Sequence, residues 1–201
     1  EQSIGHRDAP PLHERVVGPS AVLPGGRNLL VGGRVAHSVV RAELVKRGHQ
    51  SFVVSNGGPM AEQVRGQGST HIHMPIHRKT PASFGQILPM RKLLQELRPD
   101  IVHVRSRMPA WIIHLALKTL PADQQPAVVS TFHGMYSVNP YSAIMTRADQ
   151  IIAVSNCVRD YVLKNFEVAE NKLTVIQRGV DIDARPEQVA SKLLLERGRV
   201  V

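Results

Sequence analysis

Short apolar runs that each end in a polar cluster constrain the fold of this chain most strongly. Three of them lie in the segments DIVHVRSRMPAW, VVSTFHG and ADQIIAVSNCVRDYV, and VIQRGVD continues the pattern up to Asp181. Each cluster contains residues that make a turn or start a helix. Strands alternating with helices predict an α/β fold with a doubly wound, Rossmann-like parallel sheet, whose strand ends line one crevice.

The pattern predicts strands near residues 21–23, 51–55, 71–74, 101–104, 127–131, 151–154 and 173–176. The glycine-rich segment 24–33 is expected to be a loop before a helix that stops at Gly48. Pro89 is expected to kink or divide a helix over residues 84–97, and Pro109 to open the next helix.

The 201 residues are enough for one large domain with an apolar core. Residues 1–19 contain three prolines and no periodicity, so a poorly ordered leader is expected there. The predicted Rossmann-like domain covers residues 20–181. Residues 182–201 are expected to begin a linker or a truncated tail, because no further strand and helix pattern follows.

The chain is strongly basic, with a formal net charge of +9 and a pI near 10.3. An anionic membrane or an anionic glycolipid would attract its scattered Lys and Arg residues; a solvated basic surface without a dedicated partner is the alternative. Nucleic-acid binding is disfavoured, because the four Phe, three Tyr and one Trp are not interleaved with basic residues in a recognition motif.

No apolar run approaches the roughly 18 residues that cross a bilayer, and no signal segment opens the chain. A cytoplasmic location is therefore expected, with peripheral contact at the inner face of the cell membrane as an option. The single cysteine, Cys157, excludes an internal disulfide and a cysteine-based zinc site, and is expected to be a buried apolar residue.

Two glycine pairs, Gly25-Gly26 and Gly32-Gly33, flank the first predicted loop. Glycine lets backbone amides approach an anion closely; an ordinary flexible loop is the alternative. No GxGxxG motif is present, so a dinucleotide cofactor is not expected.

Arg105, Ser106 and Arg107 follow the predicted strand 101–104 and precede a helix. Two guanidinium groups and a hydroxyl in this place suit phosphate or carboxylate oxygens, with plain surface charge as the alternative. His103, inside the apolar run, is expected to be a core histidine with a hydrogen-bond partner.

His133 follows the predicted strand 127–131 and precedes Gly134, which permits a sharp turn. It is well placed to meet a hydroxyl or a phosphate, although a capping or packing histidine would show the same local pattern. Groups that suit a sugar come next in the chain, on Tyr136, Ser137, Asn139 and Tyr141.

Other polar residues at strand ends have simpler explanations. Ser155 is expected to be a helix N-cap, and Arg178 lies in the turn after the last strand, from which it could point to the cleft. His71, His73 and His77 have no carboxylates nearby at ligand spacing, so no metal site is expected.

The same blocks resemble retaining glycosyltransferases of family 4. GGRVAHSVVRAELVKRGHQSFVVSNGG is similar to the family's glycine loop, first helix and second strand, and DIVHVRSRMPAW resembles a stretch of bacterial members of the lipopolysaccharide-core type. STFHG, ADQIIAVSNCVRDYV and VIQRGVD resemble three further blocks in the same order. The resemblance covers residues 22–181.

This resemblance implies the N-terminal, acceptor-side domain of a two-domain GT-B enzyme. Such enzymes move a sugar from a nucleotide-diphosphate donor to a hydroxyl of a glycolipid or saccharide acceptor, with retention and without a bound metal or other cofactor. Envelope polysaccharide or lipopolysaccharide biosynthesis is the implied setting. The implied catalytic residue is His133, the donor phosphates would meet Gly32, Gly33 and Arg178, and the acceptor would meet Arg105, Ser106, Arg107, Tyr136 and Asn139.

The family's second domain binds the nucleotide and carries two glutamates separated by seven residues. Glu187 and Glu196 are separated by eight and lie in another context. The 201-residue chain is therefore expected to transfer little sugar by itself. Two alternative functions stay open: a non-catalytic fragment that keeps an acceptor-binding cleft, and a basic nucleic-acid-binding protein.

Overall fold

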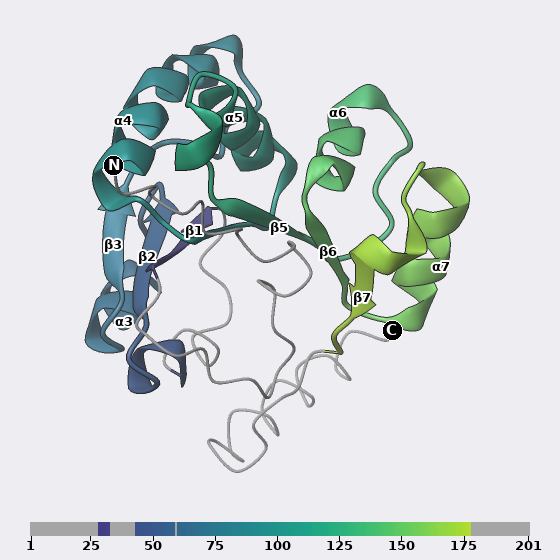
Figure 1. Cartoon of the computed structure of the whole chain (residues 1–201), viewed down its shortest axis with the longest axis horizontal. Helices are drawn as coiled ribbons and strands as arrows, with labels where there is room; N and C mark the ends of the chain where they lie inside the picture. The colour runs from purple at the N-terminus through teal and green to yellow at the C-terminus, as the bar shows by residue number, and fades with distance from the viewer. Residues whose placement is uncertain (1–27, 33–42, 59, 178–201) are drawn as a thin grey trace, which may run out of the picture.

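A computed structural model of the chain describes residues 28–32, 43–58 and 60–177 (Figure 1). The described strands are β1 (Asn28–Gly32), β2 (Gln50–Ser55), β3 (Thr70–His73), β4 (Ile101–Val104), β5 (Ala127–Phe132), β6 (Gln150–Ala153) and β7 (Leu173–Val175). They form one sheet in the order β3-β2-β1-β4-β5-β6-β7, and all neighbouring pairs are parallel. This is the predicted doubly wound α/β sheet.

Helices connect the strands. The described ones are α3 (Met60–Gly66), α4 (Ile87–Leu97), α5 (Arg107–Leu117), α6 (Pro140–Ala143) and α7 (Asn156–Asn165), with short 3-10 turns η1 (Pro81–Gln86), η2 (Ala122–Gln124), η3 (Ile144–Arg147) and η4 (Glu170–Lys172). Figure 1 shows α4 and α5 above the sheet and α3 below it. No described helix has both the length and the apolar character that a membrane crossing requires.

The main apolar core lies on the α5 side of the sheet. Leu30, Val102 and Phe132 are fully buried there, each on a strand that lies in the middle of the sheet. Ile112 of α5 and Met90 of α4 belong to the same buried cluster. Because side chains alternate along a strand, the neighbours of these residues point to the opposite face.

The position of the first strand differs from the prediction. The structure has β1 at Asn28–Gly32, inside the segment expected to be a loop, whereas residues 21–23 lie outside the described residues. The apolar run of β1 is only three residues long and has glycine pairs on both sides, and these glycines favour the prediction of a loop. The outer limits of the predicted domain also fall outside the described residues.

Three local predictions need correction or refinement. The helix expected over 84–97 is divided before Ile87, where η1 gives way to α4; Pro89 is the third residue of α4 and its missing N–H costs no helical hydrogen bond there. The next helix begins at Arg107, two residues before Pro109. Cys157 is exposed in the first turn of α7, so it is not a buried apolar residue. Gly48 has a φ of +81°, as expected for a residue that stops a helix.

Candidate active site

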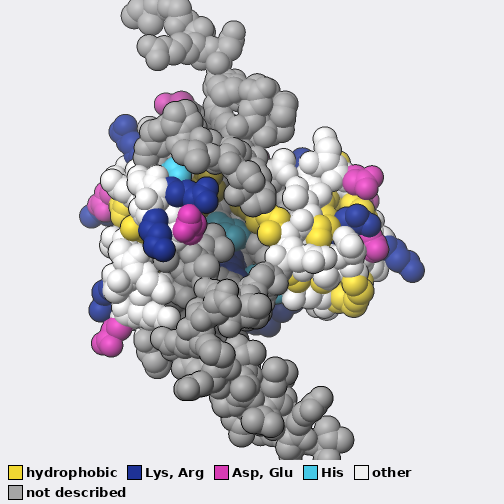
Figure 2. All heavy atoms as spheres, turned by 90° about the horizontal axis from the view of Figure 1, so that it is seen from below, with side chains coloured by type: hydrophobic (Ala, Val, Ile, Leu, Met, Phe, Trp, Pro, Cys, Tyr) yellow, Lys and Arg dark blue, Asp and Glu magenta, His cyan; other side chains and the backbone are white. Residues whose placement is uncertain are grey.

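Four polar side chains gather on one face of the sheet at its carboxyl edge, the edge where the strands end. Val104 of β4 pairs with Ser130 of β5, so His103 and Arg105 lie on the same face as Thr131 and His133. His103 Nε2 is 2.7 Å from Thr131 Oγ1. We call these four residues the polar quartet. Figure 2 views the molecule from below Figure 1, and histidine and basic side chains are visible near the centre of that view.

The quartet adjoins the point where the strand order reverses. β1 and β4 are neighbours in the sheet although β2 and β3 separate them in the chain. The backbone N–H of Arg105 donates to the carbonyl oxygen of Gly32 at 3.2 Å, which continues the ladder one residue beyond β4. Open α/β sheets bind their ligands at such a switch point. The structure therefore brings Gly32, Arg105 and His133 to one edge of the sheet.

His103 is an uncharged member of the quartet. Burial, and then Coulombic interactions with Arg105 and His133, lower the pKa of its imidazole from 6.5 to about 3. Side chains that follow two different strands thus act on one ring. His103 stays neutral at physiological pH, where it can hydrogen-bond with the Thr131 hydroxyl without adding a positive charge beside Arg105.

Gly32 has a packing role that the sequence pattern did not suggest. A Cβ at this position would lie 3.1 Å from Ile113 Cδ1 and 3.6 Å from Pro109 Cβ. Glycine therefore lets α5 approach the end of β1 closely, on the face opposite the quartet. Its predicted contact with donor phosphates stays a prediction, and the predicted Gly33 and Arg178 lie outside the described residues.

Arg107 lies apart from the quartet, in a cluster on the helix side. Its Cζ lies 5.0 Å from the ring centroid of Tyr136 and 5.2 Å from that of Tyr141, and its Nη1 donates to Ser142 Oγ at 3.0 Å. Trp111 Nε1 donates to the carbonyl oxygen of Tyr141 at 3.1 Å. Through these contacts Arg107 holds α6, and the segment that precedes it, against α5.

Three further predicted residues occupy the N-cap positions of helices. Asn139 caps α6, since its Oδ1 accepts from Ser142 N at 2.9 Å and its Nδ2 donates to Ser137 Oγ at 3.0 Å. Ser106 is at the N-cap position of α5, but its side chain makes no capping hydrogen bond. Ser155 caps α7 as predicted, by accepting from Val158 N at 3.2 Å.

Sequence reasoning missed the partners of the predicted residues. The i, i+2 spacing of Thr131 and His133 within a strand pattern was a usable signal that they share a face. No comparable signal linked Ser142 to Arg107, which lies 35 positions earlier. Nor did any signal link Lys79, whose Nζ lies 5.7 Å from the Tyr141 ring centroid, to that tyrosine.

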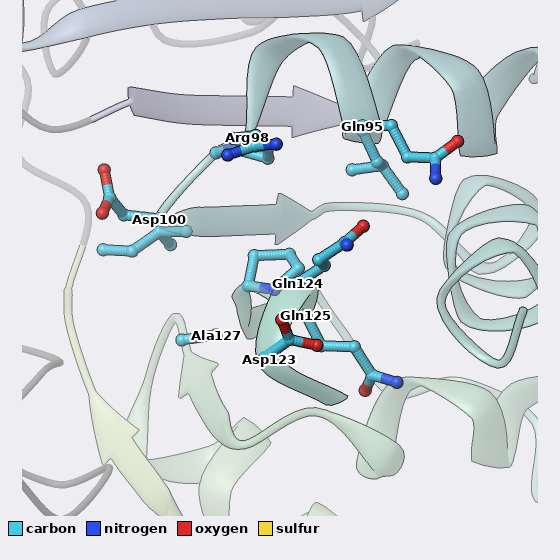
Figure 3. A pocket seen from close by; sticks show the side chains of 11 residues that line it. Gln95, Arg98, Asp100, Asp123, Gln124, Gln125 and Ala127 are labelled. Atoms are coloured by element: carbon cyan, nitrogen blue, oxygen red, sulfur yellow. The ribbon is translucent and has the colours of Figure 1, made fainter. Parts of the chain in front are cut away.

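A pocket of about 590 Å³ lies at the opposite edge of the sheet (Figure 3). Its lining includes Arg98 and Asp100, which precede β4, and Gln124 and Gln125, which precede β5. It therefore opens at the amino ends of the strands and contains none of the predicted site residues. Among the described residues, no three His, Cys, Asp or Glu side chains form a group that could hold a metal ion.

The strand order and the polar carboxyl edge define a Rossmann-like domain of the GT-B glycosyltransferase type. The sequence profile of Glycosyltransferase Family 4 matches residues 32–184, and the chain belongs to this family.

Solved structures agree with this assignment. A glycosyltransferase from Rickettsia africae ESF-5 is 27% identical, with a TM-score of 0.66, over 87% of this chain and 50% of its own. Anabaena Alr3699/HepE, solved in complex with UDP and glucose, is 15% identical with a TM-score of 0.55, over 86% and 50% of the two chains. The lipopolysaccharide outer core galactosyltransferase WaaB is 14% identical with a TM-score of 0.55, over 78% and 46%.

The last two likenesses show the shared fold alone. The chain spans about half the length of the solved structures that it matches. No curated protein sequence matches it.

Proposed function

We propose that the whole protein transfers a sugar from a nucleotide-diphosphate sugar to a hydroxyl of a saccharide or glycolipid acceptor, with retention of anomeric configuration. Assembly of envelope polysaccharide or lipopolysaccharide is the proposed setting. The observation that carries the proposal is the polar quartet at the switch point of a family 4 sheet. The described chain would supply the acceptor-side domain, within residues 20–181.

The quartet has the groups that such a transfer needs. A departing nucleoside diphosphate develops negative charge, which the Arg105 guanidinium and a donor N–H from His133 would stabilise. Neutral His103, bonded to Thr131, would keep β4 and β5 in register beneath these two groups. Positioning of the donor and the acceptor would supply the rest of the rate, without a protein nucleophile, a metal or another cofactor.

The proposed partners are a nucleotide sugar and a saccharide or glycolipid, with no nucleic acid. Anabaena Alr3699/HepE, which shares the fold, was solved in complex with UDP and glucose, which supports a nucleotide sugar as donor. The proposed location is the cytoplasm, in peripheral contact with the inner face of the cell membrane. The net charge of +9 supports contact with anionic lipid.

Transfer is expected to require more than this domain. The chain covers only about half of the solved structures that it matches. We expect the 201-residue chain alone to release little nucleoside diphosphate, and a version joined to the second half of a matching glycosyltransferase to release it in an acceptor-dependent way.

Acceptor-dependent release of nucleoside diphosphate by this joined protein tests the proposal. Arg105→Ala should lower the rate by about tenfold or more, because a charge-assisted contact with an anionic oxygen is lost. Lys46→Ala removes an equal charge from an exposed helical position and should leave the rate unchanged. Equal rates for the two variants would contradict the proposal. So would salt-dependent DNA binding that both substitutions weaken to the same extent.

A further inference from the structure

One stretch of the described chain is cationic and contains no carboxylate. From Gln63 to Gln95 there is no Asp or Glu, and the Lys and Arg residues are Arg65, Arg78, Lys79, Arg91 and Lys92. Two of the few exposed large apolar side chains in the described residues lie in the same stretch. Phe84 is 43% exposed and Leu88 is 69% exposed.

The turn before η1 is held in one shape. Ser83 is buried, its Oγ donates to the carbonyl oxygen of Arg78 at 2.7 Å, and its N–H donates to the carbonyl oxygen of Thr80 at 3.0 Å. The exposed side chains of Arg78 and Lys79 therefore lie on a fixed loop beside η1. The next residue after Ser83, Phe84, points outward from the same turn.

The helix that follows continues this surface. In α4, Met90 and Leu94 face the core, whereas Leu88 and Lys92, one turn apart, are exposed. Lys92 Nζ lies 3.8 Å from Glu96 Oε1 in an exposed i, i+4 pair, which holds it only weakly. We call Arg78, Lys79, Phe84, Leu88 and Lys92 the basic-apolar face.

This face borders the edge that carries the polar quartet. The loop at Arg78 follows the carboxyl end of β3, and α4 lies beside α5 in the layer above the sheet (Figure 1). Lys79 stacks on Tyr141, and Tyr141 stacks on Arg107 at the start of α5. A partner surface that binds the basic-apolar face would therefore lie close to the carboxyl edge of the sheet.

We propose that the basic-apolar face docks on an anionic lipid bilayer. Exposed Phe and Leu side chains suit the boundary between headgroups and acyl chains, and the flanking cations suit lipid phosphates. Single-stranded nucleic acid would need several aromatic platforms, and Phe84 is the only aromatic residue of the face. The inference deepens the proposed function, since docking would bring a membrane-anchored acceptor to the carboxyl edge; the docking itself requires no sugar transfer.

Cosedimentation of the 201-residue chain with vesicles tests the proposal without donor or acceptor. Vesicles that contain phosphatidylglycerol should bind the chain, and vesicles of phosphatidylcholine alone should bind it far more weakly. The double variant Arg78→Gln/Lys92→Gln should lower the partition coefficient by about tenfold or more. The charge-matched control Lys164→Gln/Lys172→Gln, on exposed positions near β7, should lower it much less.

A separate variant tests the contribution of the apolar side chains to vesicle binding. Phe84→Ala/Leu88→Ala keeps every charge and should also weaken binding, most visibly at high salt where the electrostatic part is screened. An equal fall of the partition coefficient in Arg78→Gln/Lys92→Gln and in Lys164→Gln/Lys172→Gln would overturn the proposal in favour of a diffuse basic surface. Binding to duplex DNA as tight as to vesicles, lost in the same variants, would overturn it in favour of a nucleic-acid site. If the chain does not bind vesicles while the two-domain protein still transfers sugar, the docking proposal is wrong and the proposed function stands.

Discussion

His133 lies one residue beyond β5, on the face of Thr131 and near enough to His103 to lower its pKa. In the proposed reaction it touches the transferred sugar or the departing diphosphate. His133→Ala should lower turnover of the two-domain protein by about tenfold or more, in line with the loss of a positioned proton donor. The thermal unfolding midpoint should change little, because His133 lies outside the strand and outside the apolar core.

A second histidine provides the control. His114 lies on α5 and its Nε2 is 3.1 Å from Arg147 Nη1, away from the quartet. His114→Ala should leave turnover unchanged. A normal rate for His133→Ala would remove His133 from the catalytic site.

His103 predicts a pH dependence of stability. In the unfolded chain the imidazole of His103 is protonated near pH 6.5, whereas in the folded protein it is protonated only near pH 3. Because the unfolded state binds more protons between these values, the free energy of unfolding should fall as the pH drops from 6.5 toward 3, by at most about 1.4 kcal/mol per pH unit.

His103→Gln keeps a hydrogen-bonding group next to Thr131 but does not titrate. Chemical denaturation at several pH values should therefore give a shallower slope for this variant than for the natural sequence. Identical slopes would show that His103 titrates normally in the folded state.

Arg107 was predicted to contact the acceptor directly, and its observed contacts point to a positioning role. Arg107→Ala should free the segment from Tyr136 to Ser142 and expose Trp111, whose Nε1 bonds to Tyr141. Because Trp111 is the only tryptophan, its fluorescence emission should shift to the red. Arg107→Lys should recover only part of the shift, since lysine lacks the planar group that stacks on tyrosine.

Arg159→Ala is the matched control for this measurement. Arg159 pairs with the neighbouring exposed Asp160 on α7, so its loss should not move the emission. An unshifted spectrum for Arg107→Ala would contradict the positioning role.

At the scale of elements, the two glycines around the end of α3 should respond in opposite directions to alanine. Gly68 has a φ of +80°, and a Cβ there would lie 2.8 Å from Val45 Cγ1, so Gly68→Ala should lower the free energy of unfolding by about 1 kcal/mol or more. Gly66 ends α3 with open space around it, so Gly66→Ala should raise the free energy of unfolding by roughly 0.5 kcal/mol. Equal denaturation midpoints for the two variants would contradict the positive φ at Gly68.

Most elements could be predicted because their signals are local. β4 was predicted at the residues where it is observed, since the run Ile101–Val104 is bounded by Asp100 and by Arg105-Ser106. β1 could not be placed, because Gly25-Gly26 and Gly32-Gly33 surround a run of three apolar residues. The edge on which Arg105 and His133 lie followed from the topology, whereas the contacts of Arg107 depend on packing between distant segments.

At the scale of the whole molecule, the proposed transfer should not depend on a divalent cation. No carboxylate belongs to the polar quartet, and Mg²⁺ prefers oxygen ligands. Addition of a chelator to the two-domain protein should therefore leave the rate unchanged. A loss of activity that added Mg²⁺ restores would contradict metal-free transfer.

An experimental structure of the two-domain protein with a bound nucleotide-diphosphate sugar would show at which edge of the sheet the donor binds. We expect the sugar and the diphosphate at the carboxyl edge, within hydrogen-bonding reach of His133 and Arg105. A donor bound instead in the pocket beside Arg98 and Asp100, at the amino ends of β4 and β5, would contradict the proposed site.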